Sequence, residues 1–287
     1  MPTFSNPQAK PYYCVVGHPV SHSLSPQIHH SFAEQLGIDL LYERVDVRPG
    51  QLRSGLAQFE TAGGRGMNVT VPLKEEAVSL ATELAPRARK AGAGNTIIVN
   101  SPGDYTVDNT DGVGLVTDLT VNLGLSLLGK RILILGAGGA VRGVLLPLIE
   151  RVPAHIRIAN RTPDKATKLV ERFKQDACEH DVDLSASGFT NFKQDSFDII
   201  INATSLGLDG KVPNIPVELC SGAECCYDMM YDRSGVTAFT RFGLEHGAAR
   251  VADGLGMLVE QAAEAFHLWH GVRPLTSGVI QSLRQIP

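Results

Sequence analysis

The residues that could do chemistry begin with a pair of serines. Ser23 and Ser25 stand at the start of a helix-compatible stretch, directly before Pro26. Two hydroxyls near the N-terminus of a helix can hold a carboxylate without an added positive charge. Ser25 followed by a proline is equally typical of a helix N-cap, so the residues alone leave both interpretations open.

Further polar side chains follow where strands are expected to end. Asn68 and Thr70 fall on one face of a strand if the period of two holds, and Lys74 comes soon after. Asn95 and Asp111 then place an amide and a carboxylate at strand ends or in turns. Groups of this kind can orient a hydroxylated ligand and move a proton. Taken singly, Lys74 is also typical of a solvated lysine and the others of turn residues.

A glycine-rich turn in the middle of the chain suits a phosphate group. The aliphatic run 130–135 has the length of a strand and ends in Gly-Ala-Gly-Gly-Ala (136–140), after which an apolar, helix-compatible run begins. Glycines let the backbone approach a ligand closely, and a helix N-terminus offers unpaired N–H groups. Val141 departs from the usual Gly-x-Gly-x-x-Gly fingerprint, but the strand, turn and helix still predict a pyrophosphate site.

The end of the next strand indicates which nucleotide binds. Asn160, Arg161 and Thr162 follow the glycines by about 20 residues, where an NAD-binding protein carries an acidic residue for the ribose. No carboxylate stands here, and these side chains, with Lys165 nearby, suit a 2′-phosphate. We therefore expect NADP rather than NAD. The alternative is an ordinary surface arginine beyond a strand.

The elements that must position these residues predict an α/β protein. The runs expected as strands are 12–16, 41–47, 66–71, 95–99, 130–135, 156–159, 197–203, 226–230 and 249–251. The runs expected as helices are 26–36, 51–61, 163–178 and 255–270. Alternating strands and helices predict parallel pairing, with helices on both faces of the sheet.

The chain is expected to form two domains. Residues 1–112 together with 255–287 would be an N-terminal α/β domain that binds the substrate and carries the catalytic residues. Residues 113–254 would be a Rossmann-like, doubly wound NADP-binding domain. The boundary is expected near residues 110–115, and the two domains would face each other across a cleft.

The composition excludes several classes of function. Of the 287 residues, 43% are hydrophobic and 20% charged, the net charge is -4 and the mean hydropathy is zero, which is typical of a globular chain. The sequence has no dense Lys/Arg run, spanning apolar stretch or signal-like N-terminus, so we expect no nucleic-acid or membrane partner and a cytoplasmic location. A small molecule is the expected partner. The five cysteines lack paired spacing, which predicts free thiols and no metal site.

In this order, the motifs resemble the shikimate dehydrogenase family. They are Ser-x-Ser-Pro, Asn-Val-Thr-Val-Pro-Leu-Lys, Gly-Asn-Thr, Asp-Asn-Thr-Asp-Gly, Gly-Ala-Gly-Gly-Ala, Asn-Arg-Thr, Asn-Ala-Thr-Ser, Asp-Met-Met-Tyr and Gly-Leu-Gly-Met-Leu-Val-Glu-Gln, and they span nearly the whole chain. The resemblance implies reversible reduction of 3-dehydroshikimate to shikimate with NADPH, a step of aromatic amino-acid biosynthesis. The family's two-domain plan agrees with the boundary expected above.

The resemblance also implies a role for each site residue. Lys74 and Asp111 would be the catalytic pair, in which Lys74 exchanges the proton of the reacting hydroxyl and Asp111 orients the ammonium. The substrate would be bound by Ser23, Ser25, Asn68, Thr70, Lys74, Asn95, Asp111, Tyr231 and Gln261. NADP would be bound by Gly136, Gly138, Gly139, Ala140, Asn160, Arg161, Thr162, Lys165, Thr204, Gly254 and Met257. Met257 and Gln261 are four apart, so one helix face would show a thioether to the nicotinamide and an amide to the substrate.

Two other functions compete with this one. A related dehydrogenase would act on quinate, which carries an extra hydroxyl beside the carboxylate. Dual-specificity members of the family commonly tolerate NAD and often carry an acidic residue where Arg161 stands, which weighs against that function. A non-catalytic, NADP-responsive binding protein on the same fold would not need Lys74, Asp111 and Gln261 together. The expected assembly is a monomer or a homodimer.

Overall fold

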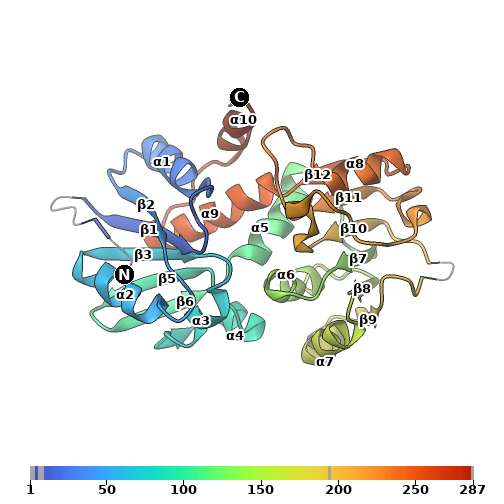
Figure 1. The fold of residues 1–287 in the computed structure, drawn as a ribbon, viewed down its shortest axis with the longest axis horizontal. Helices are drawn as coiled ribbons and strands as arrows, with labels where there is room; N and C mark the ends of the chain where they lie inside the picture. Colours follow the sequence, from blue (N-terminus) through green and yellow to red (C-terminus); the bar gives the residue numbers. More distant parts are fainter. Residues whose placement is uncertain (1–3, 6–9, 193–194, 286–287) are drawn as a thin grey trace. The chain divides into compact units, whose positions relative to one another are not determined.

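A computed structural model describes residues 4–5, 10–192 and 195–285, and the chain divides into two compact units (Figure 1). Unit 1 comprises residues 1–114 and 259–279, and unit 2 comprises residues 115–258 and 280–287. The two domains expected from the sequence were defined by the ligands they would bind, whereas these units are defined by how the chain packs. The bounds of the ligand-binding domains therefore stay a prediction.

Unit 1 is built, over its described residues, on a six-stranded mixed sheet in the order β2-β1-β3-β5-β6-β4. Its strands are β1 (Tyr12–Gly17), β2 (Leu41–Asp46), β3 (Gly64–Val69), β4 (Glu83–Leu84), β5 (Thr96–Ser101) and β6 (Asp104–Asp108). β1 pairs in parallel with β2 and β3, whereas β5 runs antiparallel to both β3 and β6. The expectation of parallel pairing therefore holds for only part of this sheet.

Helices cover both faces of the unit 1 sheet. They are α1 (Ser25–Leu36), α2 (Leu52–Thr61), α3 (Lys74–Val78), α4 (Pro86–Ala91) and α9 (Leu255–His270). Side chains of α2 and α3 pack with alternate strand residues into one buried cluster, and α1 and α9 lie over the other face (Figure 1). Gly66 allows the close approach of α9, because a Cβ there would lie 2.4 Å from Nε1 of Trp269.

Unit 2 is built on a parallel sheet of six strands within its described residues, in the order β12-β11-β10-β7-β8-β9. The strands are β7 (Arg131–Leu135), β8 (His155–Ala159), β9 (Asp183–Ser187), β10 (Ile199–Asn202), β11 (Cys225–Asp228) and β12 (Val251–Asp253). Read from β9 and numbered along the chain, the order is 3-2-1-4-5-6, that of a doubly wound dinucleotide-binding sheet. The expected α/β, Rossmann-like fold is confirmed.

Two buried layers enclose this second sheet. α6 (Gly139–Ile149), α7 (Pro163–Glu179) and part of α5 (Asp111–Thr117) pack on one face, and α8 (Ala238–Glu245) packs on the other. The two central strands, β7 and β10, are nearly continuous runs of Ile and Leu because both faces of the sheet are buried there. Unit 2 also contains η1 (Asp118–Asn122), η2 (Ser205–Asp209) and η3 (Val217–Cys220), and α10 (Ser277–Gln285) ends the described chain.

The structure confirms most of the expected elements and adds others. Every expected strand and helix is present, with bounds within two residues of those expected. The strand expected at 249–251 lies later, as β12. Elements that the patterns did not indicate are β4, β6, β9, α3, α4, α5, α8, α10 and the short helices η1, η2 and η3.

Candidate functional site

The topology of unit 1 gathers polar residues at one edge of its sheet. β3 and β6 end at this edge, and the antiparallel β5 begins there, with Asn68 paired to Thr96 and Thr96 paired to Asp108. The backbone N–H of Val69 donates to the carbonyl oxygen of Asn95 at 2.8 Å. Polar residues that lie far apart in the sequence therefore stand next to one another.

Lys74 and Asp111 form an ion pair at this edge. Lys74 Nζ donates to Asp111 Oδ2 at 2.6 Å, with 19% of the lysine side chain and 8% of the aspartate side chain exposed. The pair is held from several directions, because Asp111 N donates to Asn109 Oδ1 and the Lys74 carbonyl accepts from Gly94 N. An ammonium with this little exposure and a fixed carboxylate partner is oriented rather than free in solvent.

Asn95 is the centre of the hydrogen-bond network. Its Nδ2 lies 2.9 Å from Asp111 Oδ1 and 3.1 Å from Gln261 Oε1, and its Oδ1 accepts from Thr110 N at 2.8 Å. Asn68 joins the network because its Nδ2 lies 3.2 Å from the Asn95 carbonyl oxygen. Of the expected substrate residues, the structure therefore links Asn68, Lys74, Asn95, Asp111 and Gln261.

A cluster of ion pairs that the sequence did not indicate stabilises the end of β6, shortly before Asp111 in the chain. Arg87 donates to both carboxylate oxygens of Asp108, at 2.7 and 2.9 Å, and to Glu264 Oε1 at 3.0 Å. The 177 positions between Arg87 and Glu264 explain why spacing in the sequence gave no signal. The bidentate geometry fixes the end of β6, from which the chain continues to Asp111.

The two serines lie at the start of α1. Ser23 Oγ donates to Ser25 Oγ at 3.1 Å and accepts from Ser25 N at 3.3 Å. Of the two interpretations left open for Ser25, the N-cap is not the one observed, because Leu24 occupies that position with helical dihedral angles and Ser25 is the first helical residue. The Ser23 hydroxyl thus satisfies the first N–H of the helix, whereas the Ser25 hydroxyl does not act as a cap, which favours the ligand interpretation for Ser25. Thr70 follows β3, and its γ-methyl packs where a Cβ on Gly17 would stand.

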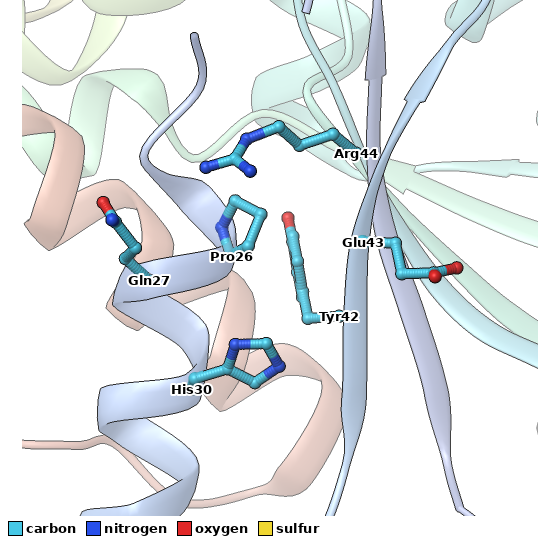
Figure 2. Close-up of a pocket in the computed structure, with 6 residues that line it drawn as sticks. All are labelled: Pro26, Gln27, His30, Tyr42, Glu43 and Arg44. Atoms are coloured by element: carbon cyan, nitrogen blue, oxygen red, sulfur yellow. The ribbon is translucent and has the colours of Figure 1, made fainter. Parts of the chain in front are cut away.

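A cavity of about 490 Å³ lies between α1 and β2. Figure 2 shows the Arg44 guanidinium above Pro26 and the Glu43 carboxylate on the opposite side of the strand. The lining residues are Pro26, Gln27, His30, Tyr42, Glu43 and Arg44. None of the expected site residues is among them, so the polar network and not this cavity is the candidate site.

Unit 2 offers the expected nucleotide site at the switch point of its sheet. The glycine loop follows β7 and the Ala203-Thr204 segment follows β10, and the chain reverses its direction of strand addition between these two strands. Gly136 has a φ of +116°, and a Cβ there would lie 3.1 Å from the Ala203 carbonyl oxygen. At Gly138, the N-cap of α6, a Cβ would meet no atom within 4 Å. The exposed helix start can therefore accept a pyrophosphate.

The end of β8 carries the residues expected to select the nucleotide. Arg161, Thr162 and Lys165 are exposed, and Asn160 Nδ2 donates to the Thr162 carbonyl oxygen at 2.9 Å. No acidic side chain stands at 160–162 to repel a 2′-phosphate. Together with the glycine loop, these residues fit NADP.

The residues expected near the nicotinamide, Thr204, Gly254 and Met257, lie in two segments of unit 2. Thr204 N and Oγ1 donate to Asn202 Oδ1, at 3.1 and 2.8 Å. Gly254 is packed, since a Cβ would lie 2.3 Å from the Met229 carbonyl oxygen, and Met257 is 8% exposed within the core. Tyr231, which was expected to contact the substrate carboxylate instead, is partly buried after β11. Their roles toward ligands stay predictions.

Comparisons with known proteins identify relatives along nearly the whole chain. The family models that match are the shikimate dehydrogenase substrate binding domain at residues 15–97, shikimate / quinate 5-dehydrogenase at 119–207, and the shikimate 5′-dehydrogenase C-terminal domain at 254–284. The chain is 49% identical to a shikimate dehydrogenase (NADP(+)) of Alkalilimnicola ehrlichii, over 95% of this chain and 98% of that protein. It is 50% identical to the enzyme of the same name from Dechloromonas aromatica, over 95% of this chain and 97% of that protein.

A solved structure agrees with these relatives. Shikimate 5-dehydrogenase from Thermus thermophilus, in complex with NADP(H) and shikimate, superposes with a TM-score of 0.80 at 34% identity. The match covers 96% of this chain and 99% of that one.

Proposed function

The chain belongs to the shikimate dehydrogenase family, and from this premise we propose that it catalyses the reversible NADPH-dependent reduction of 3-dehydroshikimate to shikimate. The resemblance found in its motifs is thereby confirmed. The observation within the structure that carries the proposal is the Lys74–Asp111 pair, 2.6 Å apart at the edge of a polar network. This step belongs to the biosynthesis of aromatic amino acids.

The substrate needs one anion site and several neutral hydrogen-bonding groups, because it is a ring with a carboxylate and hydroxyls. We assign the carboxylate to Ser23 and Ser25, whose hydroxyls lie at the start of α1, with Tyr231 as a further contact. The ring hydroxyls are assigned to Asn68, Thr70, Asn95, Asp111 and Gln261. Four of these five, Thr70 being the exception, belong to the Asn95 network.

Lys74 is assigned the proton transfer. Reduction of a ketone produces an alkoxide, and an ammonium beside that oxygen can protonate it as the charge develops. In the reverse direction the amine takes the proton of the hydroxyl. Asp111 holds the lysine nitrogen in place and can accept a hydrogen bond from the same hydroxyl.

NADPH supplies the hydride when it is bound. We assign its pyrophosphate to Gly136, Gly138, Gly139 and Ala140, and its 2′-phosphate to Asn160, Arg161, Thr162 and Lys165. Thr204, Gly254 and Met257 are assigned to the nicotinamide half. On this assignment, residues 1–112 and 255–287 form the substrate domain and residues 113–254 the NADP domain.

The setting of the protein follows from simpler features. Cys14, Cys178, Cys220, Cys225 and Cys226 are free thiols, as in proteins of reducing compartments, and we propose a cytoplasmic location. Across the described part of the chain, every helix is too short or too polar to cross a lipid bilayer. We propose a monomer or a homodimer, which light scattering of the purified protein decides.

The test of the proposed function is a pair of assays with one substitution. The purified protein should oxidise NADPH with 3-dehydroshikimate and reduce NADP⁺ with shikimate. Lys74→Ala should lower kcat by about 10²-fold or more with little change in the KM of shikimate, because the proton transfer and not the binding is lost. The control is Lys10→Ala, which removes an exposed lysine–aspartate pair of the same unit and should leave kcat unchanged.

Three outcomes contradict the proposal in different ways. Equal loss of kcat and of substrate affinity in Lys74→Ala would make Lys74 a binding residue. Faster turnover of quinate than of shikimate would indicate the quinate enzyme. Binding of NADPH without turnover of any of these substrates would indicate a nucleotide-responsive binding protein.

A further inference from the structure

Tyr42 is a buried polar residue that the proposed mechanism does not use. It lies on β2 with 2% of its surface exposed, and its Oη donates to Asn68 Oδ1 at 2.7 Å. On the other side of the same amide, Asn68 Nδ2 donates to the Asn95 carbonyl oxygen and to Thr96 Oγ1, both at 3.2 Å. The Asn68 amide is therefore held from both ends.

A count of donors and acceptors shows what this arrangement leaves for a ligand. An amide has two N–H donors and a carbonyl oxygen with two lone pairs. Both N–H groups of Asn68 are directed to protein atoms, and Tyr42 occupies one lone pair of Oδ1. One lone pair remains, so Asn68 can accept a hydrogen bond from a substrate hydroxyl and has no proton left to give.

The surroundings of Tyr42 keep its hydroxyl protonated and fixed. Burial, with a smaller contribution from the Cys14 thiol, raises the pKa of the Tyr42 phenol well above its usual range, and a hydrogen bond with the Ser25 side chain opposes this. The ring stacks on His29, with centroids 4.2 Å apart and planes inclined by 8°. The hydroxyl is thus a rigid donor to Asn68.

We propose that Tyr42 is a positioning residue for substrate recognition: its hydroxyl orients the Asn68 amide so that the remaining lone pair of Oδ1 accepts from a ring hydroxyl of the substrate. The inference rests on the proposed function, because it assumes a polyhydroxylated substrate at Asn68. It goes beyond that function by assigning a role to a residue that does not itself contact the ligand.

The test is a double-mutant cycle on the full chain. Tyr42→Phe keeps the ring on His29 and removes only the hydroxyl, so the KM of shikimate should rise about 3- to 10-fold while the KM of NADP⁺ stays unchanged. Asn68→Ala should raise the KM of shikimate further, and the double variant should match Asn68→Ala alone, because Tyr42 acts through Asn68. The control is Tyr12→Phe, which removes a buried hydroxyl bonded to Glu43 Oε2 at 2.8 Å in the same sheet and should leave both KM values unchanged.

The outcomes separate this inference from the function on which it rests. If the wild-type protein turns over shikimate but Tyr42→Phe has an unchanged KM, the inference alone is overturned. The same conclusion follows if the two substitutions multiply in the double variant, or if Tyr42→Phe raises the KM of NADP⁺ as much as that of shikimate. A wild-type protein with no turnover of shikimate would overturn the proposed function and the inference together.

Discussion

His29 should make unit 1 less stable in mild acid. Its ring is fully buried against the rings of Tyr42, Phe32, Phe266 and Trp269. Burial, with a smaller contribution from repulsion by His270, lowers the pKa of His29 to about 3. In the unfolded chain a histidine titrates near 6.5. Between these values the unfolded state binds a proton that the folded state does not, so stability is lost as the pH falls.

The size of the effect follows from the two pKa values. Between pH 7 and pH 5 the folded chain keeps His29 neutral while the unfolded chain becomes protonated, which costs about 2 kcal/mol of unfolding free energy. The full difference, reached only near pH 3, is about 5 kcal/mol. His29→Phe keeps an aromatic ring against Tyr42 and removes the titrating group. The pH dependence of this variant should therefore be weaker by about 2 kcal/mol over the same interval.

The measurement uses the single tryptophan of the chain. Trp269 lies in unit 1, with its ring centroid 5.3 Å from that of His29, so its fluorescence reports the unfolding of this unit. Urea titrations at pH 5 and pH 7 give the unfolding free energies of the wild type and of His29→Phe. His267→Phe, at an exposed position of α9, controls for the loss of one histidine. Equal pH dependence in the wild type and His29→Phe would refute the reasoning, since His29 would then titrate alike in both states.

Three further predictions concern the nucleotide site. Arg161→Ala should raise the KM of NADPH about 10-fold or more and the KM of NADH much less, because a charge-assisted hydrogen bond to the 2′-phosphate is lost. Steady-state kinetics with both nucleotides measure this difference. Equal effects on the two KM values would remove the case for 2′-phosphate recognition. Gly136→Ala should lower the unfolding free energy by about 1–3 kcal/mol, because the φ of +116° strains any side chain there. Gly138→Ala should leave the unfolding free energy nearly unchanged but raise the KM of NADPH. A Gly136→Ala protein as stable as the wild type would contradict the prediction for that residue and show that the loop relaxes.

The sequence predicted the nucleotide unit well because its signals are local. The run before Gly136 is aliphatic and uninterrupted, and the turn to α6 follows at once, so β7 and the loop could be placed from adjacent residues. The edge strand β9, Asp183–Ser187, reads Asp-Leu-Ser-Ala-Ser and lacks that hydrophobic signal. β6, Asp104–Asp108, lies among Gly, Asp and Asn residues that favour turns.

The sequence could name the polar residues of unit 1 but could not join them. The Lys74–Asp111 contact spans 37 positions and the Asn95–Gln261 contact spans 166, so only the fold brings these atoms together. Tyr42 was not predicted as part of the site, because a tyrosine in a strand is as typical of a core as of a polar network. Its hydroxyl acquires a role only from Asn68, 26 positions away.

The direction of β5 explains why the polar network can be so compact. If β5 ran parallel to β3 and β6, the residue before β5 would lie at the opposite edge of the sheet from the residues that follow β3 and β6. β5 is antiparallel to both neighbours, so Asn95, directly before it, arrives at the edge where β3 and β6 end. The Asn95 side chain can then reach Asp111 and Gln261 while its backbone carbonyl meets Asn68. A one-residue slip of β5 would turn these groups to the other face, so the register of one strand decides whether the site exists.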